Sequence, residues 1–138
     1  MRYDSSGKLV LAPTDLSNHL GCHHLTNQER LAKSGTVEKP VRYSPVIEAL
    51  RERGIAHESE YKNHLIAEGH VVVDAEGQNT LELMKSGADV LYQARLGDGS
   101  WSGIADFLLK VDTPSSLGDW SYEAIDTKLA KETKGGTV

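Results

Sequence analysis

The sequence predicts an α/β fold in which a mixed sheet of about four strands is flanked by helices. Two observations support this prediction. Two long helical patterns come before the first strand pattern, and a short helical pattern separates that strand from three more. The last three strand patterns follow one another through Gly-rich and Pro-rich turns, as in a meander. At 138 residues, the chain is long enough for one domain, expected to span residues 1–138.

Composition narrows the class of protein. The chain is 38% hydrophobic and 25% charged, which is typical of a globular domain, and its net charge of −5 argues against a strongly basic protein that coats nucleic acid. It contains no apolar run that could span a bilayer and no signal-peptide pattern, so we expect a cytoplasmic protein without membrane contact. The single cysteine, Cys22, excludes a disulfide within the chain.

The first helical pattern opens at Pro13, with Thr14 as the expected N-cap, and continues to Ala32. The Gly-Cys-His-His cluster at 21–24 is a candidate break within it. The second pattern has Ser44 as N-cap, Pro45 at the first helical position, and a stop at Gly69. Its expected core-facing stripe consists of Ile47, Leu50, Gly54, His57, Tyr61 and Leu65. A glycine within that stripe predicts close approach of another element.

The second half of the chain alternates strand and turn patterns. We expect a strand at 70–73 and a short helix at 81–85. Three further strands are expected at 89–96, 101–111 and 120–129, with a hairpin turn at 97–100.

Two acids in this half stand among apolar residues. Asp106 lies within the strand predicted at 101–111, and Asp126 lies within the one at 120–129. Lys128 follows Asp126 by two positions, so in a strand the two side chains share a face. Aspartate is rare in strands, and two neighbouring carboxylates repel unless a cation lies between them. Oxygen ligands suit Mg²⁺ or Mn²⁺, so these residues suggest a metal-dependent phosphodiester hydrolase site.

Each candidate has a structural alternative. Asp106 and Asp126 could end their strands and pair with Lys or Arg. His57 could be a hydrogen-bonded core residue rather than a ligand, and its neighbours Glu58 and Glu60 are expected to be surface charges. His19, Cys22, His23 and His24 contain zinc-ligand types, but no glutamate follows His19 as a metalloprotease motif requires.

In the order of its predicted elements and in its candidate site residues, the chain resembles the RecB-like branch of the PD-(D/E)XK nuclease superfamily. More closely, it resembles RecB-family nucleases found alone or fused to helicases, which are related to the iron–sulfur nucleases of CRISPR adaptation. The resemblance covers nearly the whole chain and is carried by Leu11–Leu25, Arg51–Glu58, Ser86–Ala94, Gly103–Leu108 and Gly118–Ala130.

The resemblance implies a restriction-endonuclease-like core and a role for each site residue. It implies that His57, Asp106, Asp126 and the backbone carbonyl of Thr127 bind the metal, Mg²⁺ or Mn²⁺. Lys128 would orient the attacking water and stabilise charge on the phosphate. Because histidine is a softer ligand than carboxylate, this set favours Mn²⁺.

The resemblance also implies features that this sequence contains in part. Cys22 matches the first of four cysteines that hold a 4Fe–4S cluster, and the other three would lie beyond the residues present here. Family members continue into a further helix after the position of Lys128, so the chain is expected to be a nuclease core truncated at its C-terminus.

The implied activity is metal-dependent hydrolysis of DNA at single-stranded ends, with a helicase domain or subunit as a further partner. The alternative is a module of the same fold that binds nucleic acid or docks a helicase without turnover.

Overall fold

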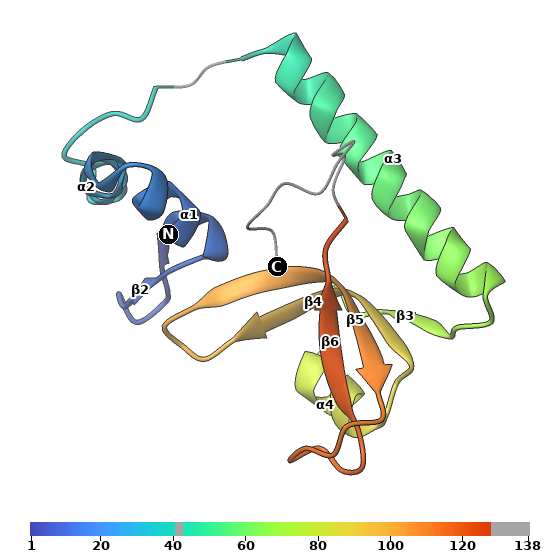
Figure 1. Ribbon diagram of the computed structural model, residues 1–138. Coiled ribbons are helices and arrows are strands. Elements are labelled where there is room, and N and C mark those ends of the chain that lie inside the picture. The colour runs from blue at the N-terminus through green and yellow to red at the C-terminus, as the bar shows by residue number, and fades with distance from the viewer. Residues whose placement is uncertain (41–42, 128–138) are drawn as a thin grey trace. The chain divides into compact units, whose positions relative to one another are not determined.

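The structure is a computed structural model that describes residues 1–40 and 43–127 (Figure 1). These residues form two compact units. The first contains the described residues of Met1–Arg42 together with Arg95–Ile104, and the second contains those of Tyr43–Ala94 and Ala105–Val138. Lys128, one of the predicted site residues, lies outside the described residues.

The first unit begins with a small antiparallel pair, β1 (Arg2–Tyr3) and β2 (Leu9–Val10). Two helices follow, α1 (Pro13–Gly21) and α2 (His23–Lys33). The predicted break between them is confirmed: Cys22 is extended, with φ −162° and ψ 106°, so its backbone cannot continue the helix.

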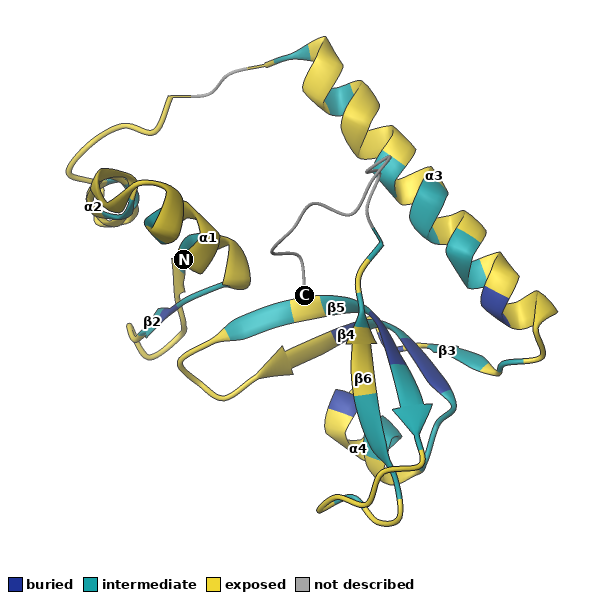
Figure 2. Ribbon diagram, viewed as in Figure 1, coloured by how far each residue is buried: buried dark blue, intermediate teal, exposed yellow. Residues whose placement is uncertain are grey.

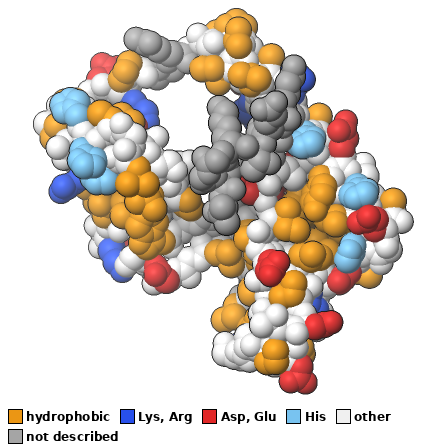
Figure 3. Space-filling view, viewed as in Figure 1, with side chains coloured by type: hydrophobic (Ala, Val, Ile, Leu, Met, Phe, Trp, Pro, Cys, Tyr) orange, Lys and Arg blue, Asp and Glu red, His pale blue; other side chains and the backbone are white. Residues whose placement is uncertain are grey.

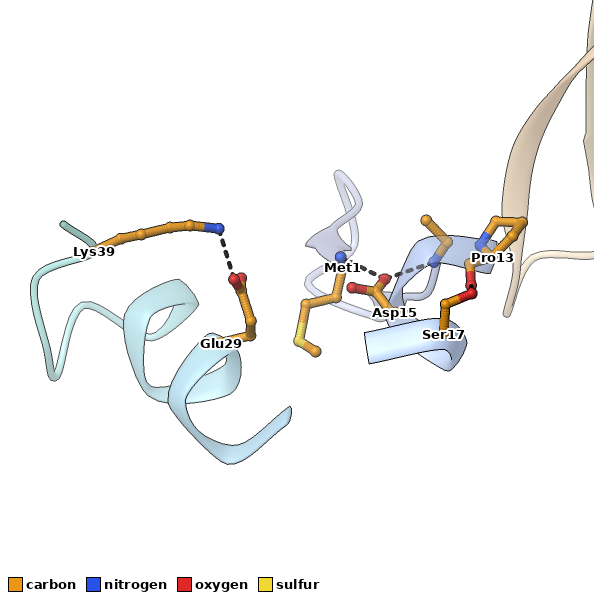
Figure 4. A network of polar contacts seen from close by, with 7 residues as sticks. Met1, Pro13, Asp15, Ser17, Glu29 and Lys39 are labelled. Atoms are coloured by element: carbon orange, nitrogen blue, oxygen red, sulfur yellow. Dashed lines mark hydrogen bonds and ion pairs between the residues drawn. The ribbon is translucent and has the colours of Figure 1, made fainter. Parts of the chain in front are cut away.

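The start of α1 corrects the predicted cap. The N-cap is Ala12, not Thr14, and its N–H donates to Oδ2 of Asp15 at 2.7 Å (Figure 4). The same Asp15 oxygen lies 2.5 Å from the amino group of Met1. Burial alone would raise the pKa of Asp15, but these two donors outweigh it and lower the pKa.

The second unit contains α3 (Pro45–Ala67), α4 (Thr80–Lys85) and most of a four-stranded sheet. The strands lie in the order β3 (Val72–Asp74), β4 (Val90–Gly97), β5 (Ser102–Val111) and β6 (Ser121–Ile125). Strands β3 and β4 are parallel, and β5 and β6 are antiparallel. The predicted α/β class with a mixed sheet flanked by helices is therefore confirmed.

Two apolar clusters hold this sheet, one on each face. Figure 2 shows buried residues in dark blue on the strands of the sheet, near the end of α3 and on α4. On one face Leu65 of α3 packs against Val90 and Phe107. On the other, Leu91 and Leu108 belong to a cluster that also contains side chains of α4. Neighbouring residues of β4 and of β5 thus point to opposite helices, which explains why apolar residues stand side by side at Val90–Tyr92 and Phe107–Leu109.

Only the last turns of α3 pack in the way its stripe predicts. Leu65 is buried, whereas Ile47 and Leu50 are 64% and 54% exposed, so the prediction that these two face the core is wrong. Figure 3 shows hydrophobic side chains at the surface over the start of α3. At Gly54 an added Cβ would meet no described atom within 4 Å, so the close approach inferred from this glycine is absent from the described part of the chain.

Asn79 caps α4 by accepting hydrogen bonds from the N–H groups of Leu81 and Glu82. None of the helices within residues 1–40 and 43–127 is both long enough and apolar enough to cross a bilayer.

The double-sided packing predicts a steep cost at Phe107. The Phe107→Ala variant should lose about 3–5 kcal/mol of unfolding free energy, because it leaves a cavity between α3 and the sheet. Urea denaturation measures this loss. Val71→Ala is the matched control, since Val71 is 66% exposed and its truncation should cost under about 1 kcal/mol. Equal losses at the two positions would contradict the packing described.

Candidate functional site

The two predicted acids meet at the end of the β5–β6 ladder. Phe107 pairs with Ile125, and extending this antiparallel register by one residue brings Asp106 opposite Asp126. Strand β6 ends at Ile125, so Asp126 leads out of the sheet instead of lying within the strand as predicted. The pairing of the two acids therefore depends on the register between β5 and β6, and the spacing within one strand does not create it.

Asp106 lies in an environment that disfavours its ionised form. Its pKa is raised, first because the group is partly buried, then because its carboxyl is hydrogen-bonded to Asp126, with further repulsion from the charges of Glu58 and Asp126. The N–H of Thr127 donates to Oδ2 of Asp106 at 3.1 Å, and this hydrogen bond lowers the pKa of Asp106. A cation beside the two carboxyls would remove the repulsion that raises this pKa.

A second polar contact joins α3 to β4. The side-chain amide of Gln93 donates to Oε1 of Glu58. The pKa of the neighbouring Tyr92 is raised, first by burial and then by its hydrogen bond to Glu58 and the charge of that carboxylate. Two successive residues of β4 therefore contact one carboxylate of α3, and this contact limits rotation of the helix over the sheet.

An irregularity of β4 makes this double contact possible. Val90 and Tyr92 pack with the α3 cluster, and Leu91 lies in the α4 cluster, as strand alternation requires. Ala94 also lies in the α4 cluster, although regular alternation would turn it toward α3. The extra residue is Gln93, with φ 55°, the single non-glycine residue at positive φ among the described residues. Such a bulge reorients one side chain, here that of Gln93.

The predicted metal ligands are only partly assembled. Asp106, Asp126 and Thr127 lie together, whereas no hydrogen bond or ion pair joins half-buried His57 to another described residue. Within residues 1–40 and 43–127, no three His, Cys, Asp or Glu side chains are placed to hold one ion. The geometry thus contains the carboxylate half of the predicted site and does not bring His57 into it.

Cys22, the predicted iron–sulfur ligand, is exposed at the break between α1 and α2. Beside it, the rings of His19 and His23 stack 4.3 Å apart, and Nδ1 of His19 lies 2.9 Å from the hydroxyl of Thr26. His19 and His23 therefore contact one another, and His19 also contacts a hydroxyl group.

Sequence reasoning missed Glu58 and Gln93. Glu58 was expected to be a surface charge like Glu60, but it is half-buried against Gln93, whereas Glu60 is exposed as predicted. A usable signal was present: one polar residue, Gln93, interrupts a run that is otherwise apolar from Val90 to Ala94.

Comparison of this chain with protein-family models, with curated proteins and with solved structures finds no match in any of the three.

The positive φ at Gln93 can be tested by two substitutions that remove the same side-chain contact. Both Gln93→Ala and Gln93→Gly lose the hydrogen bond to Glu58, but only glycine adopts φ 55° without strain. The glycine variant should therefore be more stable by about 1 kcal/mol, because alanine in the left-handed region costs roughly 1–2 kcal/mol. Thermal unfolding compares the two, and an alanine variant as stable as the glycine variant would argue against the bulge.

The raised pKa of Asp106 predicts how stability depends on pH. The folded chain keeps the Asp106 proton at pH values where the unfolded chain has lost it, so stability falls as pH rises from 3.8 through the raised pKa. Asp106→Asn removes this dependence and should be more stable than the wild type at pH 7 in EDTA.

Below the unfolded pKa of Asp106 the advantage should vanish, because both forms then carry a neutral side chain. Denaturant unfolding across pH measures the difference. Asp119→Asn, at an exposed loop position, should show no such trend. A variant less stable than the wild type at pH 7 would contradict the raised pKa.

Proposed function

We propose that this chain contains the core of a metal-dependent nuclease that hydrolyses phosphodiester bonds of DNA. The observation that supports the proposal best is the pair of Asp106 and Asp126, held together by sheet register, with a raised pKa on Asp106. Structural acids usually gain a basic partner, whereas Asp106 is hydrogen-bonded to a second acid.

The donor types suit a hard divalent cation. Asp106 and Asp126 supply carboxylate oxygens, and the carbonyl of Thr127, next to Asp126, is a further oxygen donor. Under this proposal these groups hold Mg²⁺ or Mn²⁺, with His57 as a nitrogen ligand that favours Mn²⁺. When bound, such an ion supplies positive charge to the scissile phosphate and makes a water molecule a stronger nucleophile.

The chain's own residues would perform the remaining tasks. Donation from the Thr127 N–H to Oδ2 of Asp106 fixes the orientation of that carboxyl, leaving Oδ1 free of this contact. The contact of Gln93 with Glu58 holds α3 against β4 and so limits where His57 can move. Lys128, which lies outside the described residues, would orient the attacking water and stabilise charge on the phosphate.

The resemblance to RecB-like nucleases supports single-stranded DNA ends as the substrate and a helicase domain or subunit as a partner. A 4Fe–4S cluster would need cysteines in addition to Cys22.

Cleavage assays test the proposal directly. Asp126→Ala and Lys128→Ala should each lower Mn²⁺-dependent cleavage of single-stranded DNA by roughly a hundredfold or more, because each removes a group that holds or stabilises charge at the phosphate. Asp119→Ala, an exposed aspartate of the loop before β6, should cleave like the wild type. Unchanged cleavage in both site variants would refute the assignment of these residues.

A second candidate function is a module that binds nucleic acid or docks a helicase without turnover. It is favoured by one observation, namely that no three-ligand metal group exists among the described residues. Binding that is independent of Mn²⁺, together with absence of cleavage by the wild type, would identify this function.

A further inference from the structure

A cavity in the first unit is lined by two arginines that form no ion pair with any described residue. Arg2 of β1 and Arg95 near the end of β4 both line it, and its volume is about 420 Å³. Its other walls are Met1, the segment Val10–Thr14, and Ser102–Ile104. All these residues belong to one compact unit, so the cavity is defined by that unit alone.

The two guanidinium groups converge on one hydroxyl. Nη2 of Arg2 lies 3.4 Å from Oγ of Ser102, and Nη1 of Arg95 lies 3.5 Å from the same atom. The two nitrogens are therefore no more than roughly 7 Å apart, close enough for like charges to repel. Because the hydroxyl accepts from both arginines, its own hydrogen remains to be donated to a third group.

No carboxylate of the described residues offsets these charges. Neither Arg2 nor Arg95 takes part in an ion pair there, although acidic residues outnumber basic ones in the chain by 20 to 15. Asp15 stands close in sequence to the cavity wall, but its carboxylate is bound by the Met1 amino group and the Ala12 N–H (Figure 4). An anion between the guanidinium groups would remove their repulsion.

The remaining wall defines the kind of anion. Val10, Leu11, Pro13 and Ile104 give the cavity an apolar side next to the cationic one. A simple inorganic anion gains no binding energy from apolar side chains. A nucleotide combines a phosphoryl group with a sugar and a base, which pack against an apolar surface. The volume is in the usual range of about 300–1,000 Å³ for small-ligand sites, so one nucleotide unit fits.

We propose that this cavity binds one nucleotide unit of single-stranded DNA, with its phosphoryl group held by Arg2, Arg95 and Ser102. Two guanidinium forks and a hydroxyl match the oxygens of a phosphate, as arginine does at many phosphate sites. The choice of DNA rests on the proposed nuclease function, whereas the phosphoryl site rests on the cavity itself. Its role is to hold the strand, separately from hydrolysis.

Binding of fluorescein-labelled (dT)10, followed by anisotropy in EDTA, tests the site without cleavage. The double variant Arg2→Ala/Arg95→Ala should bind about tenfold more weakly or worse, and the slope of log affinity against log salt should fall by roughly one. Arg51→Ala is the matched control, because Arg51 is already paired with Glu48 at 2.8 Å, and it should bind within twofold of the wild type.

Arg2→Lys/Arg95→Lys keeps both charges without the guanidinium forks and should give an intermediate affinity. The proposal is overturned if the wild type does not bind (dT)10. It is also overturned if the double alanine variant binds (dT)10 within twofold of the wild-type affinity. Both arginines are exposed, so folding of the variants is checked by circular dichroism. As a measurement on the unmodified chain, the Nε–Hε NMR signals of Arg2 and Arg95 should shift on titration with thymidine monophosphate, and unmoved signals overturn the site.

Competition separates the possible sources of the phosphoryl group. Thymidine monophosphate should displace (dT)10 at lower concentration than inorganic phosphate does, and equal displacement would overturn the nucleotide assignment. The nuclease function is judged separately from Mn²⁺-dependent cleavage. If the wild type cleaves DNA but the arginine variants bind (dT)10 like the wild type, the nucleotide site is refuted and the nuclease function stands. If binding depends on the arginines but the wild type does not cleave DNA, the nuclease function is refuted and the nucleotide site stands.

Discussion

The second unit depends on burial of β4 and β5 from both sides. Val90 and Phe107 face α3, and Leu91 and Leu108 face the cluster that contains α4, so a slip of either strand by one residue would turn each set of side chains into the packing of the opposite face. This packing fixes the strand register. Register in turn sets Asp106 opposite Asp126, so the acidic pair is a consequence of how apolar side chains are buried.

The site concentrates several departures from what is locally favourable. Gln93 has a backbone conformation that is unfavourable for a non-glycine residue, and the carboxyl of Asp106 is hydrogen-bonded to a second acid. Both are stable because the strands around them are held by double-sided packing. Locally unfavourable features that rigid surroundings support are typical of sites that bind or react.

Periodicity in the sequence predicts most of the architecture. The break at Cys22, the cap at Ser44 and the four strands all follow from local rules, because turn chemistry and alternation act over a few residues. The errors concern long-range packing. Ile47 and Leu50 carry a helical apolar stripe, yet no described element reaches them, and helical period alone cannot tell where a sheet ends. Glu58 was misjudged because its partner, Gln93, lies 35 residues away.

The uneven support of α3 has a consequence for its local stability. Its last turns are anchored by Tyr61 and Leu65 and its middle by the Glu58 contact, whereas the turns before Glu58 rely on helix propensity, with Gly54 among them. Considering only contacts with the described residues, we expect the helix to unfold progressively from its first turn and this local unfolding to stop at Glu58. His57 stands at that limit, so the helix can be ordered at this histidine while the preceding turns exchange their amide hydrogens far faster.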